Sequence, residues 1–325
     1  MRAVVFAGAG GNEVVGVEER PDPAPGPDDV VVRVRFAGLS PADLHHRNGR
    51  YGSLPGRPNG IAGMEVAGVV DSCGERVSTW RPGDRVFGFV GGGGLATRVL
   101  ANERLLARIP DSVEEREAAS VPSSFISAND ALSTQAGLRA GETLLVHGAA
   151  GGFGTAAVQL GTAGGARVLG VVRSDDAARV VESLGAEVVR DDGFAATVLE
   201  LTDGRGADVI AEVIGAPHFP ANLDALAPRG RIVVLGVGGG DEAVVPLVAM
   251  MQKRAVLRGT TLRSRSPEEQ ALAVRAFEHE VVPLLATGRV RAVVDSVYAA
   301  AEAGAAFDRL EARGKAGNVV IDLGE

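Results

Sequence analysis

The sequence is poor in cysteine and in long apolar runs. Its 325 residues include a single cysteine, Cys73, so neither an intrachain disulfide nor a four-cysteine zinc site can form. No segment has the ~20 uninterrupted apolar residues of a membrane span, and the apolar run at residues 3–6 is too short for a signal peptide. We therefore expect a soluble, cytoplasmic protein that does not act at a membrane.

Positive charge is also scarce. The chain has 33 Lys and Arg against 41 Asp and Glu, a net charge of −8, and no long basic run. This balance argues against a nucleic acid or an anionic membrane as the main partner. The length favours two domains, and a hydrophobic content of 46% is enough for a sizeable core.

Two kinds of secondary-structure pattern follow each other along the chain. Residues 1–122 contain short valine-rich stretches separated by Gly, Pro and Asp, which predicts a small, barrel-like β-rich domain. From residue 123 onward, apolar stretches alternate with helical ones, which predicts a parallel, doubly wound sheet. In that second region we expect strands at 143–146, 167–172, 186–190, 209–212 and 231–235, and helices at 155–162, 176–184, 194–201 and 218–226.

The last sixty residues return to the pattern of the first domain. Ser266 and Pro267 are typical of a helix start, and we expect that helix to run to residue 285. Short strands at 292–297 and 319–323 flank a helix around 299–311. We therefore assign residues 1–122 and 263–325 to one domain, and residues 123–262 to the other.

A glycine-rich turn follows the first strand of the second region. Gly148, Gly151 and Gly154 are spaced three apart, between the strand at 143–146 and the helix that starts at residue 155. A strand, a glycine-rich turn and a helix N-terminus together form a seat for a pyrophosphate. The spacing is not the strict fingerprint of such sites, so a plain strand-to-helix connection is the alternative.

Several motifs along the chain together resemble those of a known superfamily. They lie at residues 37–43, 63–70, 80–86, 146–160, 253–254 and 262–265. Through them the chain is similar to medium-chain dehydrogenase/reductases over nearly its full length, specifically to zinc-independent, zeta-crystallin-like NADPH:quinone oxidoreductases. The resemblance implies an α/β fold in which a GroES-like β-rich catalytic domain accompanies a Rossmann doubly wound parallel sheet, with the active site in the cleft between them.

Zinc is the first question, because many members of this superfamily contain it. The resemblance places Ser40 and Met64 where the zinc enzymes carry Cys and His, and a hydroxyl and a thioether do not make that site. Glu65 alone cannot hold a metal. The adjacent His45 and His46 lie on a predicted helix, where their rings point about 100° apart and do not chelate together. We therefore expect no metal.

The residues at the end of the second Rossmann strand predict whether the cofactor is NADPH or NADH. The resemblance places Val172 where NAD enzymes carry an acidic residue for the ribose hydroxyls. Arg173 and Ser174 follow, a cation and a hydroxyl suited to a 2′-phosphate. This favours NADPH over NADH. In the alternative, Asp175 or Asp176 binds the ribose of NADH.

Other features bear on how the cofactor is bound. The acidic pair at residues 191–192 could oppose a phosphate, which weakens the prediction of NADPH. His147, at the end of a buried strand, is predicted to be structural. The resemblance implies cofactor contacts at Ser127, Ala150, Gly151, Gly152, Phe153, Gly154, Arg173, Ser174, Ile214, Leu235, Gly236, Val237 and Asn318.

Without a metal to polarise a carbonyl, the substrate must already be activated for hydride transfer. Quinones and conjugated enones meet that requirement. Candidate proton donors are Ser40, His45, Tyr51 and Ser127. Ser40 is equally suited to cap a helix, and Tyr51 to lie exposed in a loop.

The expected function is therefore a zinc-independent, NADPH-dependent quinone oxidoreductase. The alternatives are an enoyl or enone reductase of secondary metabolism, which would use the same hydride chemistry, and an NADPH-binding protein with little catalysis. Residues 256–261 resemble the edge strand through which relatives pair. Because an exposed apolar edge strand is a liability unless it is covered, we expect a homodimer.

Overall fold

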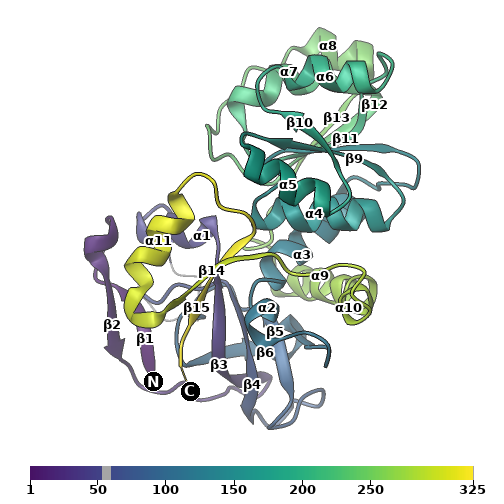
Figure 1. Ribbon diagram of the computed structural model, residues 1–325. Coiled ribbons are helices and arrows are strands. Elements are labelled where there is room, and N and C mark those ends of the chain that lie inside the picture. The colour runs from purple at the N-terminus through teal and green to yellow at the C-terminus, as the bar shows by residue number, and fades with distance from the viewer. Residues whose placement is uncertain (53–59, 325) are drawn as a thin grey trace. The chain divides into compact units, whose positions relative to one another are not determined.

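The computed structural model describes residues 1–52 and 60–324. The chain divides into two compact units, Met1–Ile126 with Arg265–Glu325, and Ser127–Ser264; Figure 1 shows their elements coloured along the chain. Among the described residues, no helix is long and apolar enough to cross a membrane. The expected α/β class is confirmed, because one unit is built on a mostly antiparallel sheet and the other on a parallel one.

Unit 1 is built on a seven-stranded sheet. Its strands run in the order β14-β15-β3-β4-β5-β7, with β6 paired to β3, while β1 and β2 form a separate hairpin-like pair. Alternating valines of β3 enter the core, whereas Arg33 between them is exposed. The strands are β1 (Arg2–Phe6), β2 (Val15–Glu19), β3 (Asp29–Leu39), β4 (Glu65–Cys73), β5 (Arg85–Phe89), β6 (Arg98–Asn102), β7 (Leu106–Arg108), β14 (Val294–Ala299) and β15 (Asn318–Asp322).

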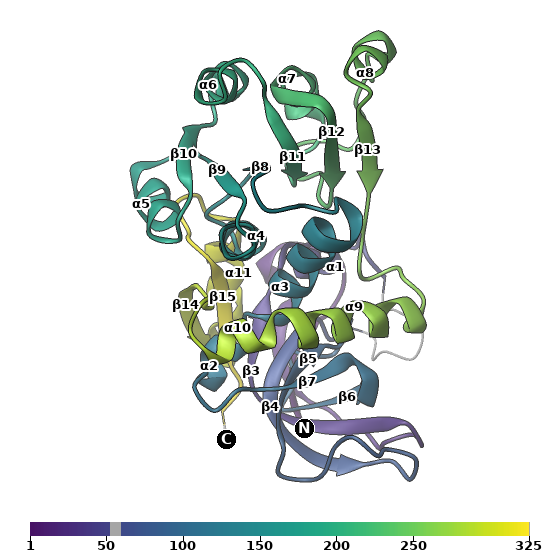
Figure 2. The same cartoon turned by 90° about the vertical axis from the view of Figure 1, so that its right-hand side faces the viewer.

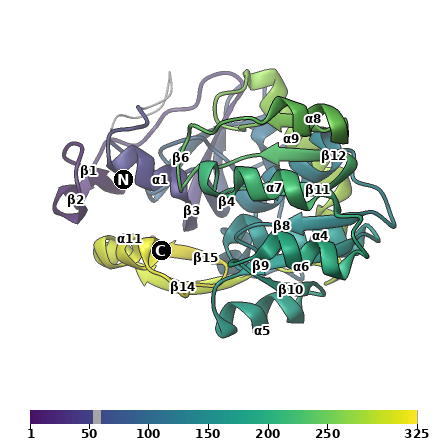
Figure 3. The same cartoon turned by 90° about the horizontal axis from the view of Figure 1, so that it is seen from above.

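The C-terminal segment completes this sheet. Strand β15 pairs antiparallel with β3, and β14 pairs parallel with β15. Helix α11 (Ala303–Glu311) lies beside these two strands (Figure 3) and buries Phe307 completely in the core of the unit. Strand β14 covers residues 294–299 instead of the expected 292–297, and the short 3-10 turn Ala300–Glu302 separates it from α11.

The helix expected from Ser266 to residue 285 is two helices. The start is as predicted: the Ser266 side chain accepts the backbone N–H of Glu269, whose carboxylate accepts the N–H of Ser266. Helix α9 (Pro267–Glu280) then ends, and α10 (Val282–Ala286) follows. Pro283 has no N–H with which to continue the ladder of α9. The remaining helices of this unit are α1 (Pro41–Arg47), α2 (Glu115–Ala118) and α3 (Pro122–Asn129), which contains the division between the units.

Unit 2 contains the predicted parallel sheet. Its six strands run in the order β10-β9-β8-β11-β12-β13, and every neighbouring pair is parallel. Figure 1 shows α4 and α5 on one face and α6, α7 and α8 on the other. The strands are β8 (Thr143–Val146), β9 (Arg167–Val172), β10 (Glu187–Arg190), β11 (Ala207–Glu212), β12 (Leu226–Val234) and β13 (Val256–Gly259); the helices are α4 (Gly152–Ala163), α5 (Asp175–Ser183), α6 (Phe194–Leu201), α7 (Phe219–Ala225) and α8 (Leu247–Lys253).

Besides the start of α4, which is described below, the largest boundary difference in this unit lies between α7 and β12. Helix α7 starts at Phe219 and ends at Ala225, and strand β12 begins at Leu226, five residues before the expected start at 231. The extra residues form an irregular section, because the pairing register of β12 with β11 shifts between Ala207 and Val209. Arg229 there has a φ of +65°. The predicted stop at Pro228–Gly230 is therefore a bulge inside a longer strand.

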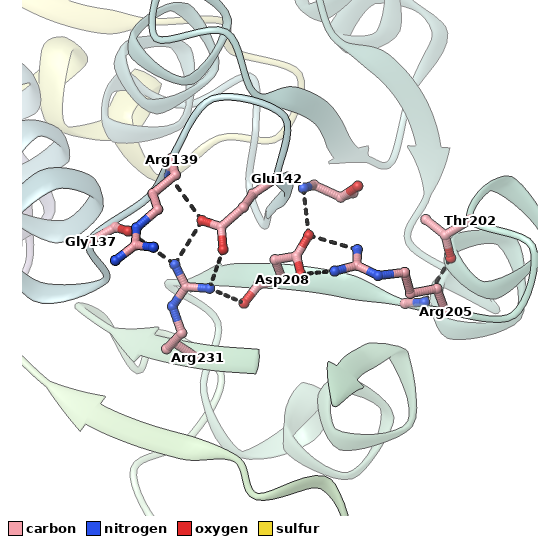
Figure 4. Close-up of polar contacts among 9 residues, drawn as sticks. Gly137, Arg139, Glu142, Thr202, Arg205, Asp208 and Arg231 are labelled. Carbon is pink, nitrogen blue, oxygen red and sulfur yellow. Dashed lines mark hydrogen bonds and ion pairs between the residues drawn. The ribbon is translucent and has the colours of Figure 1, made fainter. Parts of the chain in front are cut away.

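Ion pairs join the amino-terminal ends of three strands in this sheet (Figure 4). Arg231 of β12 donates two hydrogen bonds of 2.8 Å to Glu142 and one of 3.2 Å to the carbonyl of Asp208. The Asp208 carboxylate accepts from Arg205 and from the backbone N–H of Thr143. β8, β11 and β12 are thus tied at one end of the sheet, and their opposite ends carry the loops described next.

Candidate functional site

The glycine-rich turn joins β8 to α4 by a path that requires glycine at two positions. Gly148 has a φ of +58°, in the left-handed region that glycine adopts without strain. A Cβ on Gly154 would lie 2.2 Å from the carbonyl oxygen of Gly148, so only glycine allows the helix to pack this closely on the turn. Gly148 thus permits the tight turn, and Gly154 permits close packing of the helix on it.

The start of α4 presents free backbone donors. Helix α4 begins at Gly152, three residues earlier than the expected start at Thr155. Its first ladder hydrogen bond runs from the N–H of Thr155 to the carbonyl of Gly151, at 2.8 Å. The N–H groups of Gly152, Phe153 and Gly154 therefore have no acceptor four residues back in the helix. Together with the positive end of the helix dipole, this arrangement fits a pyrophosphate.

The end of β9 carries a neutral residue followed by an exposed cation. Val172 is the last residue of β9 and is buried. Arg173 is exposed and forms no ion pair within the part of the chain that the structure describes. The side chain of Ser174 caps α5 by accepting the N–H of Ala177 at 3.3 Å. Arg173 is thus available to an anion at this edge of the sheet.

The two acidic residues that follow are engaged with other arginines. Asp175 pairs with Arg190 at the end of β10, and Asp176 pairs with Arg179 one turn further along α5. Both carboxylates lie in the first turn of α5, where they also interact favourably with the helix dipole. This arrangement disfavours the alternative in which one of them binds a ribose.

The loops after β11 and β12 lie side by side. The N–H of Gly239 donates to the carbonyl of Ile214 at 2.8 Å, and the N–H of Leu235 donates to the carbonyl of Glu212 at 2.9 Å. The predicted cofactor residues after β8, β9, β11 and β12 thus share the carboxyl edge of one parallel sheet, where such folds bind nucleotides. They are Ala150, Gly151, Gly152, Phe153, Gly154, Arg173, Ser174, Ile214, Leu235, Gly236 and Val237.

Two further predicted cofactor residues lie elsewhere. Ser127 is half-buried on α3 and is the first residue of unit 2. Asn318 begins β15 of unit 1, where its amide donates to the carbonyl of Ser120 at 2.7 Å and contacts the hydroxyl of Ser124. The side chain of Asn318 thus holds the start of α3 within its own unit, and a contact of this residue with the cofactor stays a prediction.

The positions that carry zinc ligands in related enzymes do not fit a metal. The Ser40 hydroxyl and backbone N–H both donate to Asp43, each at 2.9 Å, in a capping box at the start of α1. Met64 is fully buried. Burial, with the nearby Asp43 charge adding, raises the pKa of Glu65 to about 8, although the N–H of Ser123 donates to it. Glu65 is therefore a neutral acid at pH 7, unsuited to binding a cation.

His45 on α1 forms an aromatic pair with Tyr51, which follows that helix. Their ring centroids lie 5.0 Å apart, and the carbonyl of His45 accepts the N–H groups of both Arg50 and Tyr51. Burial, assisted by the Arg50 charge, lowers the pKa of His45, so this ring is neutral at pH 7. Tyr51 is 38% exposed. Of the four predicted proton donors, these two are the ones that the structure brings together.

Sequence reasoning missed one group of polar residues. His147 was predicted to be structural, but its partners Glu212, His218 and Asn222 were not identified. All four side chains meet beneath the carboxyl edge of the unit 2 sheet. One signal was available: His147 directly follows β8 and Glu212 ends β11, which are neighbouring parallel strands.

Comparison with known proteins identifies the family. Residues 26–111 match the alcohol dehydrogenase GroES-like domain, and residues 152–278 match the domain family described as zinc-binding dehydrogenase. The quinone oxidoreductase of Pseudomonas aeruginosa is 35% identical over 98% of this chain and 99% of its own. The chain belongs to the medium-chain dehydrogenase/reductase superfamily. It is an oxidoreductase of that superfamily, similar to its quinone oxidoreductases, as predicted.

Solved structures agree with this assignment. The quinone oxidoreductase of Pseudomonas syringae is 31% identical over 99% of both chains, with a TM-score of 0.88. A mycobacterial protein solved in complex with NADPH is 28% identical over 99% of both chains, with a TM-score of 0.89. The combination of a GroES-like domain with a Rossmann-type parallel sheet is thereby confirmed for this member of the superfamily.

Proposed function

We propose that this oxidoreductase transfers hydride from NADPH to a quinone or a similar conjugated acceptor, without zinc. The observation that carries the proposal is Arg173, an exposed cation beside the neutral Val172 at the carboxyl end of β9. The neighbouring arginines 179 and 190 are paired with carboxylates. Arg173 is thus the cation that a 2′-phosphate would meet after the second strand.

Bound NADPH supplies the hydride, and the chain supplies its binding site and orientation. The free N–H groups at the start of α4 would hold the pyrophosphate, and Arg173 would hold the 2′-phosphate. The adjoining loops after β11 and β12 would orient the rest of the dinucleotide. One hydride and one proton convert a quinone to a hydroquinone. Tyr51, with the neutral His45 beside it, supplies the proton to the quinone oxygen, and solvent then restores it.

The acceptor class follows from the chemistry of unit 1 and from the relatives. Ser40 and Met64 offer no metal site that could polarise an ordinary carbonyl, so the acceptor must take a hydride without a Lewis acid. A quinone does so readily. The similar proteins of Pseudomonas aeruginosa and Pseudomonas syringae are named quinone oxidoreductases, which supports quinones ahead of enones.

The test of nucleotide choice is an Arg173→Ala variant. We expect the KM for NADPH to rise about tenfold, because a charge-assisted contact to phosphate is worth ~1.5–3 kcal/mol, while the KM for NADH changes little. Arg179→Ala is the matched control, since Arg179 is an exposed arginine of the following helix in an ion pair with Asp176, and it should leave both values unchanged. Better use of NADH than NADPH by the unmodified enzyme would contradict the proposal.

The test of the acceptor is NADPH oxidation with a panel of simple quinones, 2-enals and an unsaturated thioester. Quinones should be reduced fastest. Faster reduction of the enals or the thioester would assign the chain to the enone reductases instead. Tight NADPH binding without oxidation by any acceptor would make it a nucleotide-binding protein.

We also propose that the chain forms a homodimer through β13. This strand ends the sheet of unit 2, and within the described residues it pairs with β12 alone. In Figure 2 it lies at the edge of that sheet, continuous with α8. Val256 and Leu257 of β13 and Leu247, Val248 and Met251 of α8 are all exposed. A second copy would cover both the outer edge of β13, which faces away from β12, and this apolar surface.

A further inference from the structure

A buried polar chain runs beneath the carboxyl edge of the unit 2 sheet. His147, after β8, Glu212, at the end of β11, and Asn222, on α7, are completely buried, and the side chain of His218 is 14% exposed. The ring of Phe194 on α6 packs edge-on against His147, with centroids 4.7 Å apart. Polar groups in such surroundings are retained only where hydrogen bonds satisfy them.

The carboxylate of Glu212 fixes the orientation of Asn222. One oxygen of Glu212 accepts the backbone N–H groups of Ile214 and Gly215, and the other accepts the amide Nδ2 of Asn222. Because a carboxylate only accepts, Nδ2 must face Glu212 and Oδ1 must face the other way. Oδ1 lies 2.7 Å from His147 Nε2. His147 therefore carries its proton on Nε2.

The second histidine is then fixed in turn. In the neutral ring, Nδ1 of His147 carries a lone pair and no proton. It lies 3.2 Å from Nδ1 of His218, so this nitrogen of His218 must donate the hydrogen bond. Nε2 of His218 lies 3.2 Å from the carboxylate of Asp191, directly after β10. Because Nδ1 of His218 donates to Nδ1 of His147, His147 stays neutral. Burial lowers the pKa of His147, against the opposing charge of Glu212.

The same side chains have the composition of a metal site. Single ligand atoms of His147, Glu212 and His218 lie within 4.8 Å of one another. However, the two oxygens of Glu212 already accept three N–H groups, and Nδ1 of His147 accepts from His218. In the described part of the chain, the hydrogen bonds therefore favour a proton at this position over a metal.

We propose that His147 is a positioning residue that makes cofactor binding proton-dependent. This inference rests on the proposed function. The chain Asp191–His218–His147–Asn222–Glu212 ends on the N–H groups of Ile214 and Gly215, and the Ile214 carbonyl in turn accepts the N–H of Gly239. It therefore holds both loops that orient the dinucleotide. A second proton on His147 would sit on Nδ1, where it would face the N–H of His218 Nδ1. Two donors cannot hydrogen-bond to each other, so the chain of hydrogen bonds would be broken.

The expected consequence is weaker binding in acid. The titratable groups facing His147 are Glu212 from β11, His218 from the turn before α7, and Asp191 after β10; α6 and α7 contribute the uncharged Phe194 and Asn222. Cofactor binding favours the neutral His147, so the affinity is full above about pH 6.5 and falls by up to tenfold for each pH unit below the midpoint.

The experiment measures the Kd of NADPH and NADH from pH 5 to 8, by fluorescence titration of the full chain. NADH is included because the 2′-phosphate of NADPH titrates near pH 6 itself, whereas NADH lacks it. In the unmodified protein the affinity for both cofactors should fall as the pH drops below 6.5, because the neutral His147, whose pKa is lowered from that value by burial, then takes up a proton. His147→Gln should remove the pH dependence seen with NADH, since an amide does not titrate in this range.

A second variant tests the same inference if His147→Gln fails to fold. His218→Gln removes a side chain whose charge contributes to lowering the pKa of His147, so the midpoint should move to higher pH. His279→Gln, at an exposed histidine of α9, is the matched control and should follow the unmodified protein.

Three results overturn the inference. The first is an NADH affinity with no pH dependence in the unmodified protein. The second is an unaltered pH profile in both site variants. The third is stoichiometric zinc binding that His218→Gln abolishes. If neither cofactor binds at any pH, it is the proposed function that has failed.

Discussion

At the residue scale, the two tyrosines offer a direct comparison of a proposed proton donor with a packing residue. Tyr51 is paired with the neutral ring of His45, whereas Tyr298, on β14, packs against the core of unit 1. We expect Tyr51→Phe to lower kcat for quinone reduction by about 10- to 100-fold, because a positioned general acid contributes roughly this much or more. Steady-state kinetics at saturating NADPH would measure it.

Tyr298→Phe is the control for that variant, and its kcat should stay within twofold of the unmodified enzyme. The KM for NADPH should be unchanged in both variants, since neither residue is placed at the carboxyl edge of unit 2. An unchanged kcat in Tyr51→Phe would show that solvent supplies the proton without help from this side chain.

The contacts of a single residue could be predicted from the sequence where its partners are neighbours in the chain. Capping of α9 by Ser266 and the positive φ of Gly148 involve neighbours in the chain, and both were predictable. The partners of His147 were not, because they depend on the pairing of Val146 with Ala211 across two parallel strands. No residue pattern near His147 specifies that register.

At the element scale, β13 and α8 form the surface on which the proposed dimer depends. Leu257 on β13 is 40% exposed. We expect Leu257→Lys to give a monomer, because a lysine on an edge strand opposes pairing with another strand. Sedimentation at micromolar concentration would measure the change. Leu272→Lys is the matched control: Leu272 is 68% exposed on α9, outside this surface, and its replacement should leave the dimer intact.

A dimer that persists in Leu257→Lys would place the subunit contact elsewhere. A monomeric unmodified protein at the same concentration would remove the proposal altogether, and the exposed apolar residues of α8 would then need another explanation.

Element types followed from the sequence more reliably than element boundaries. The alternation of strands and helices was enough to predict five of the six parallel strands of unit 2, because buried parallel strands are continuous apolar runs; the edge strand β13 was expected only from the family resemblance. The predicted end of an element was wrong where pairing with a distant strand overrides a local turn signal. Pro228 and Gly230 indicate a turn, yet their segment pairs with β11 as part of a bulged β12.

At the scale of the whole molecule, buried titratable groups of opposite behaviour set how stability depends on pH. Glu65 lies in unit 1 and His147 in unit 2. The pKa of Glu65 is raised from 4.5 to about 8 in the folded chain, so the folded state holds more protons than the unfolded state between those values. That contribution to stability is present below pH 4.5 and is lost as the pH rises through 8.

His147 acts in the other direction. Its pKa is lowered from 6.5 in the folded chain, mainly by burial, so the unfolded state binds the proton first. The contribution of the neutral ring is present above pH 6.5 and is lost as the pH falls below that value. Between them the two groups favour a stability maximum at mildly acidic to neutral pH.

Glu65→Gln tests the alkaline side of this profile, because an amide keeps an acceptor for the N–H of Ser123 and has no proton to lose. The variant should unfold at a higher urea concentration than the unmodified protein at pH 8.5, and the difference should shrink towards pH 5. Each unit of pKa shift corresponds to ~1.4 kcal/mol, so a gain of at least that size is expected at pH 8.5. Glu75→Gln, at an exposed glutamate, should show no pH-dependent difference. If Glu65→Gln is equally destabilised at both pH values, Glu65 is ionised in the folded protein, and a cation must then balance its charge.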